Sequence, residues 1–218
     1  AGTWRAARRM SALPNAIPAL TTAGGFLLVL ALMLPLVGVL LALVLGGRNA
    51  RRVVFLTLPL GLALAVAIAV EAMQTGHQLV YLLGGWAPPL GVALRADGLS
   101  VVMLLTTAAI ILAVAIYARD DFSTPAGASE ARAPLLFWTL LLAVWGSLNV
   151  IFLAGDLFTL YVALELLTFA GVPLVSLDGR AETLQAALRY LLYALIGSVL
   201  YMLGAVLLYG AYGTLDIA

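Results

Sequence analysis

The sequence predicts an all-α integral membrane protein, a bundle of about six transmembrane helices, from its composition and from the spacing of its apolar runs. Hydrophobic residues make up 64% of the 218-residue chain, and charged residues 10%. Soluble domains carry roughly 25% charged residues, so a soluble globular fold is excluded. Each apolar run has close to the ~20 residues that a helix needs to cross a bilayer.

Residue types that are missing or rare narrow the possible chemistry. The chain has no Cys and one His. Disulfides, thiolate chemistry and a His or Cys metal cluster are therefore excluded, and we expect neither a metal site nor a cofactor. Every basic residue is Arg, and the net charge of +1 gives no reason to expect binding to nucleic acid.

The apolar runs divide the chain into three parts. Residues 1–22 form a basic N-terminal segment, residues 23–133 hold three peripheral spans, and residues 134–218 hold three more. The first run is too long for a signal-peptide core of 7–15 residues, so we expect it to be retained as a span. The predicted spans cover residues 26–45, 53–70, 99–117, 135–153, 156–177 and 185–209.

Two connections have a distinct composition. Residues 74–98 combine Gly and Pro with short alternating apolar stretches, which predicts a β-hairpin between the second and third spans. Residues 119–133 mix charged and turn-forming residues and are expected to form a solvated loop.

Arginine counts predict the orientation in the membrane. The loops after the odd-numbered spans hold the larger share of the arginines, which places those loops in the cytoplasm and the hairpin on the outer, periplasmic side of a bacterial inner membrane. The N-terminal arginines oppose this orientation. The odd loops contain Arg48, Arg51, Arg52, Arg119, Arg132 and Arg180; the opposite side contains Arg5, Arg8, Arg9 and Arg95.

Glu165 is the strongest candidate for a functional residue. At 1.5 Å per residue from Asp156, it lies roughly 13 Å into its helix, near the middle of a bilayer core about 30 Å thick. Tyr161 and Thr168 share its helix face, so a carboxyl, a phenol and a hydroxyl form one stripe that could line a hydrated path. The alternative is a neutral glutamic acid that holds two helices together. We favour the ion pathway because ionisable groups inside spans usually mark one.

Three other features are candidates of lower rank. Asp156 is expected to cap its helix, with proton entry as the alternative. Arg189 is either a relay or an interfacial anchor; a gap of about 12 Å along the membrane normal argues against a direct salt bridge to Glu165. Gly197 and Gly204 suggest a close-packing face of the sixth span.

Five segments together resemble the antiporter-like subunits of respiratory complex I, of Mrp cation/proton antiporters and of membrane-bound hydrogenases. They are LGGWAPPLG (83–91), ADGLS (96–100), GDLFTLYVALEL (155–166), ALRYLL (187–192) and LLYGAYGTL (207–215).

The resemblance implies a proton channel of inverted repeats, in which Glu165 matches a glutamate paired to a lysine two spans later. It also implies a full subunit of about fourteen spans, so this chain would be a partial, N-terminal copy. Arg189 matches a position that is commonly basic. The relay lysines would come from the missing C-terminal half or from a companion chain.

We therefore expect a non-redox, ion-translocating subunit rather than an enzyme in its own right, with other membrane subunits and the lipid bilayer as partners. The first interpretation is a proton-translocating part of a complex I-like NADH:quinone oxidoreductase. An Mrp-type Na+/H+ antiporter subunit or a hydrogenase membrane subunit is the alternative. A structural membrane component without its own ion path is the alternative of another class.

Overall fold

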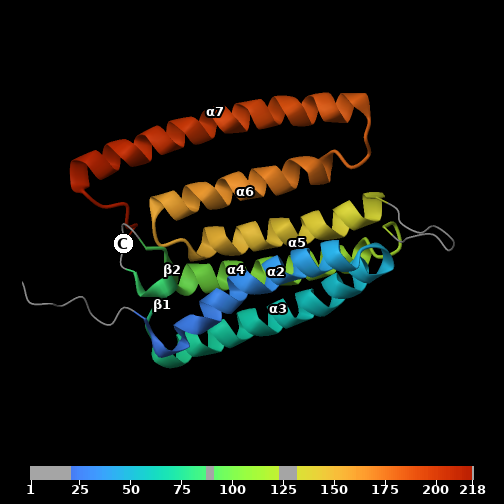
Figure 1. Ribbon diagram of the computed structural model, residues 1–218. Coiled ribbons are helices and arrows are strands. Elements are labelled where there is room, and N and C mark those ends of the chain that lie inside the picture. Colours follow the sequence, from blue (N-terminus) through green and yellow to red (C-terminus); the bar gives the residue numbers. More distant parts are fainter. Residues whose placement is uncertain (1–20, 87–90, 123–131, 218) are drawn as a thin grey trace, which may run out of the picture.

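The computed structural model describes residues 21–86, 91–122 and 132–217. It shows a bundle of long helices lying side by side, with a small hairpin at one end (Figure 1). The predicted fold class is confirmed, since six helices are long and apolar enough to cross a membrane. The elements are η1 (Ala23–Gly25), α2 (Phe26–Leu45), α3 (Gly47–Thr75), β1 (Leu79–Leu82), η2 (Leu83–Gly85), β2 (Ala93–Ala96), α4 (Gly98–Tyr117), α5 (Arg132–Leu153), α6 (Leu157–Val175) and α7 (Ala181–Tyr212). The N-terminal arginines, Pro88, Pro89 and most of the loop at 119–133 lie outside the described residues.

Two helices are longer than the apolar runs that predicted them. α3 and α7 continue until a glycine in the left-handed conformation, Gly76 (φ 65°) and Gly213 (φ 72°), ends each one. Glycine adopts this conformation without steric cost, which makes it the usual residue after a helix C-terminus. Gly46 (φ 58°) makes the tight corner between α2 and α3, and the two helices pack against each other.

α5 is the central helix of the described chain and α7 is the outermost. α5 packs against α2, α3, α4 and α6, and 44% of its most apolar stretch is buried. α7 packs mainly against α6, and only 6% of its corresponding stretch is buried (Figure 1). The face of α7 turned away from α6 is therefore apolar and exposed.

α2 crosses α5 closely, and a proline helps to join them. A Cβ on Gly146 would lie 3.3 Å from Pro35, which shows how near the two backbones come. Pro35 has no N–H, so the carbonyl of Ala31, four residues earlier in α2, loses its usual helical donor. Asn149 of α5 replaces it, donating from Nδ2 to the Ala31 oxygen at 2.9 Å.

The predicted hairpin is the centre of a larger backbone network. β1 and β2 pair antiparallel, with Leu79 opposite Ala96 and Leu82 opposite Ala93. On the other side of β2, Gly155 donates its N–H to the Ala93 carbonyl at 3.0 Å. A Cβ at Gly155 would lie 2.7 Å from that oxygen, so the corner between α5 and α6 requires glycine.

The segment after α7 returns to this network. Leu157 donates its N–H to Leu215, and Ile217 donates to Gly155, at 2.9 and 3.1 Å. Arg95 of β2 adds an ion pair to Asp216 at 2.8 Å. We call this hydrogen-bonded border of β2, the Gly155 corner and residues 214–217 the rim; it ties the end of α7 to the start of α6.

Candidate functional site in the membrane

Asp156 caps α6, as the sequence predicted. Its Oδ1 accepts the N–H of Thr159 at 2.7 Å, and its Oδ2 accepts the Thr159 hydroxyl at 2.6 Å. The residue is 8% exposed, so both oxygens are used locally rather than turned to water. This geometry is that of a helix cap, which satisfies a backbone donor that the first turn would otherwise leave free.

Glu165 lies half-buried on the α7 side of α6 and lines a pocket of about 220 Å³. Tyr161 and Thr168 line the same pocket, which is consistent with the stripe predicted from their spacing. The Thr168 hydroxyl donates to the Leu164 carbonyl at 3.0 Å, so its oxygen remains available as an acceptor. A pocket of this size has room for several waters, each of which takes about 30 Å³ in the liquid.

The opposite wall of the pocket comes from α7. Its residues were not identified from the sequence as part of a site. It consists of Ala194, Gly197, Ser198 and Tyr201. The expectation that Gly197 and Gly204 form a close-packing face is wrong for the described chain, since a Cβ on either would meet nothing within 4 Å. Small residues at 194, 197 and 198 instead leave space opposite Glu165. Their spacing of three and four was the available signal.

Tyr201 closes the pocket toward the rim. Its hydroxyl donates to the Leu157 carbonyl at 3.1 Å, and its ring lies nearly parallel to that of Tyr161, with 6.1 Å between centroids. The tyrosine pair therefore lies between Glu165 and the end of α6 nearest the hairpin. No feature of the sequence linked Tyr201 to Tyr161, because they lie on different helices.

A second, larger pocket continues from the first in the opposite direction. It has a volume of about 630 Å³ and lies between α6 and α7. Leu164 and Thr168 line both pockets, so the two adjoin near Glu165. The hydroxyl-bearing residues of the larger pocket are Thr168, Thr183 and Tyr190, and it reaches the first turn of α7, beside the loop at 176–180.

Arg189 is not brought to Glu165. It is exposed and lines a separate groove along α7 with Tyr193 and Ile196. The ion pairs found within the described residues are Arg95 with Asp216, Arg119 with Asp120, and Arg180 with Asp178. None of these three pairs includes Glu165 or Arg189. In the same described ranges, no three His, Asp or Glu residues are grouped so that they could hold a metal ion.

Comparisons with known proteins show what this chain is similar to. Residues 154–218, which contain the Gly155 corner, α6 and α7, match the family described as NADH:quinone oxidoreductase/Mrp antiporter, TM. A Na(+)/H(+) antiporter subunit of Bacillus subtilis (strain 168) is 29% identical over 191 residues, which are 87% of this chain and 38% of that protein. The chain therefore spans well under half the length of this curated relative.

Two solved structures share the fold. A chain of the Mrp complex from Dietzia sp. DQ12-45-1b has a TM-score of 0.75 and 25% identity, with 90% of this chain and 36% of that chain covered. A chain of the membrane-bound sulfane sulfur reductase, an archaeal respiratory membrane complex, has a TM-score of 0.76 and 23% identity, with 87% and 38% covered.

Six membrane-length helices, with a carboxyl in a pocket between two of them, make this a multi-pass membrane protein. In sequence the chain is similar to an antiporter membrane subunit, and it shares its fold with a chain of an Mrp complex and a chain of a respiratory membrane complex, which confirms the resemblance predicted from the sequence.

Proposed function

We propose that this chain forms part of a proton path in which Glu165 takes up and releases the transported proton. The observation that carries the proposal is the position of Glu165 in a pocket between two membrane-length helices, with hydroxyl groups around it. A carboxyl inside a span is costly unless it is paired or hydrated, and such groups usually belong to ion pathways.

The two adjoining pockets support access from one end of the helices. From the loop at 176–180, the larger pocket leads past Thr183, Tyr190 and Thr168 toward Glu165. Hydroxyl groups both donate and accept hydrogen bonds, so together with water they can carry a proton. The rim and the Tyr161–Tyr201 pair occupy the other end.

The arginine distribution supports an inner-membrane orientation in which the loop at 176–180 is cytoplasmic and the hairpin periplasmic. The exposed face of α7 supports contact with further membrane subunits, with the remainder of a longer subunit, or with a companion chain that supplies relay lysines. Arg189, exposed near the loop end of α7, is suited to anchor at the headgroups or to join a relay with such partners.

A proton-uptake assay on the assembled complex in membrane vesicles tests the role of Glu165. Glu165→Gln keeps the shape and polarity of the side chain but removes the titrating proton, so uptake should fall by about 100-fold, the lower range for a positioned acid–base group. Glu182→Gln, the same change at an exposed position in the first turn of α7, should have little effect. Wild-type uptake by an assembled Glu165→Gln complex would instead support a purely structural glutamate.

A second candidate is the exchange of sodium for protons. The curated relative named above is a Na(+)/H(+) antiporter subunit, whereas the matched family also includes NADH:quinone oxidoreductase subunits. The same assay distinguishes them: flux that requires a sodium gradient supports an Mrp-type antiporter, and flux that requires NADH and quinone supports a complex I-like assembly.

A further inference from the structure

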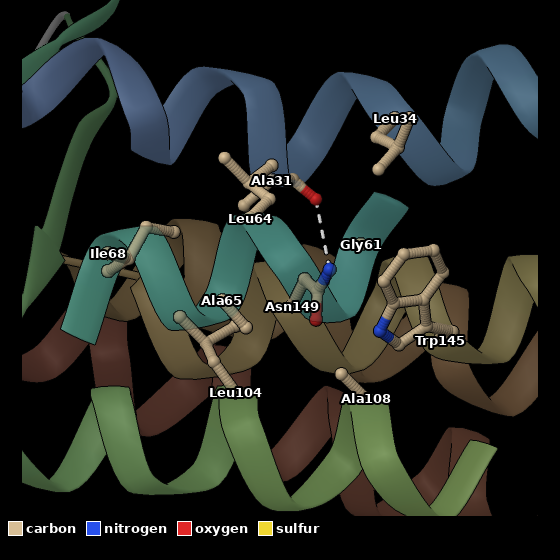
Figure 2. Close-up of a pocket in the computed structure, with 10 residues that line it drawn as sticks. All are labelled: Ala31, Leu34, Gly61, Leu64, Ala65, Ile68, Leu104, Ala108, Trp145 and Asn149. Carbon is tan, nitrogen blue, oxygen red and sulfur yellow. Dashed lines mark hydrogen bonds between the residues drawn. The ribbon is translucent and has the colours of Figure 1, made fainter. Parts of the chain in front are cut away.

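A small cavity lies away from Glu165, where α2, α3, α4 and α5 meet (Figure 2). It separates two groups of buried apolar residues, one around Trp138 and Leu142 and the other around Leu28 and Ile68. The volume of the cavity is about 10 Å³.

Two polar atoms in the cavity wall have no hydrogen-bond partner among the described residues: Nε1 of Trp145 and Oδ1 of Asn149. The residues are 2% and 3% exposed. Figure 2 shows the indole nitrogen of Trp145 turned toward Asn149. One atom is a donor and the other an acceptor, and leaving both unsatisfied in an apolar interior is costly.

The orientation of the Asn149 amide is fixed by its other contact. The Ala31 carbonyl can only accept, so the NH₂ group must face α2 and Oδ1 must face the cavity. The indole of Trp145 packs directly against Gly61 of α3, where an added Cβ would overlap the ring. The two polar atoms therefore border the cavity because of the packing around them.

We propose that this cavity is a binding site for a single buried water, which accepts the N–H of Trp145 and donates to Oδ1 of Asn149. The volume of about 10 Å³ leaves room for one water and no more, since a cavity needs roughly 10–15 Å³ to hold one. Apolar cavities stay dry, whereas buried waters occupy cavities with two to four polar partners. The water completes the hydrogen bonding of the amide that joins α5 to α2, and it is independent of the path at Glu165.

A cryo-EM map of the assembled complex, at a resolution that shows ordered waters, tests the proposal directly. We expect a density peak within 3.2 Å of both atoms, as is usual for hydrogen bonds. The Trp145→Phe complex, which keeps the Asn149–Ala31 bond, should lose this peak. A map with no peak, or with Trp145 bonded directly to Asn149, would overturn the proposal.

Ultraviolet resonance Raman spectroscopy gives a second measurement, since indole bands report hydrogen bonding at the N–H. The wild-type minus Trp145→Phe difference isolates Trp145 and should show a hydrogen-bonded indole. Trp138→Phe is the matched control, because Nε1 of Trp138 already donates to the Phe122 carbonyl at 3.1 Å. A free N–H band for Trp145 in the wild-type protein would contradict the proposed site.

Discussion

Single polar residues in this apolar chain have separate and recognisable roles. Glu165 could be identified from the sequence because its position in a span is enough to mark it. The hydrogen-bond partner of Asn149 could not be identified from the sequence. Its actual partner, the carbonyl freed by Pro35, is 118 residues away, and no local pattern connects the two.

Asp97 offers a test of stability at the residue scale. It precedes α4 and accepts the Ser100 N–H at 2.7 Å; the hydrogen bonds from the Ser100 backbone and side chain lower the pKa of Asp97 from its ordinary value of 3.8. A lowered pKa in the folded state means that the carboxylate form of Asp97 stabilises the fold. This contribution is fully present at pH values above the ordinary pKa, which is that of the unfolded chain. This contribution is lost as the pH falls through the folded-state pKa.

We expect Asp97→Ala to destabilise the fold by about 1 kcal/mol at pH 7, the usual cost of losing a helix cap. Thermal unfolding in detergent from pH 2.5 to 7 measures this. Asn also caps helices but does not titrate, so Asp97→Asn should stay close to wild type at pH 7 while losing the acid-dependent part. Identical acid sensitivity of wild type and Asp97→Asn would show that Asp97 does not contribute to it.

At the scale of elements, the existence of each helix was predictable and its exact neighbours were not. The six runs gave the spans because bilayer thickness fixes their length. The chain also turns tightly at Ala154–Gly155, between two of these spans. The cause of this turn became visible only when β2 was placed beside it, because the sequence does not say which backbone Gly155 approaches.

The corner predicts opposite effects for two Gly-to-Ala changes. Gly155→Ala should cost about 1–3 kcal/mol, as overpacking does, since its Cβ would meet the Ala93 carbonyl, a backbone atom that cannot rotate away. Gly171→Ala, inside α6 where a Cβ meets nothing within 4 Å, should stabilise by about 0.5–1 kcal/mol. Denaturation of both variants in the same detergent compares them. Equal effects would refute the proposed contact.

For the whole molecule, the sequence predicted the number of spans but not their packing order. α5 and α7 are both apolar, yet one is central and the other peripheral, because burial inside protein and exposure to lipid tails favour similar residues. Hydropathy therefore does not separate them. α7 packs mainly against α6 within this chain, and the chain matches only 38% of the length of its Bacillus subtilis relative.

The fold and the orientation can be tested together by cysteine labelling, since the chain has no Cys of its own. His77 and Thr214 lie at the hairpin end and Glu182 at the other, and all three are exposed. A membrane-impermeant maleimide should label His77→Cys and Thr214→Cys from outside the inner membrane, and Glu182→Cys only after permeabilisation. The reverse pattern would contradict the orientation alone, whereas different sides for 77 and 214 would contradict the fold.

The rim bears on the direction of the proposed proton transport. At the hairpin end, two backbone hydrogen bonds and the Tyr161–Tyr201 pair hold α6 and α7 together, while the other end contains the larger pocket. Under the proposed function, Glu165 would therefore exchange protons with the end of the helices that contains the larger pocket, whereas the contacts at the hairpin end separate it from that side. The proposed proton release on the hairpin side then requires that the Tyr161–Tyr201 contact separate, or that a partner helix on the exposed side of α7 provide another route.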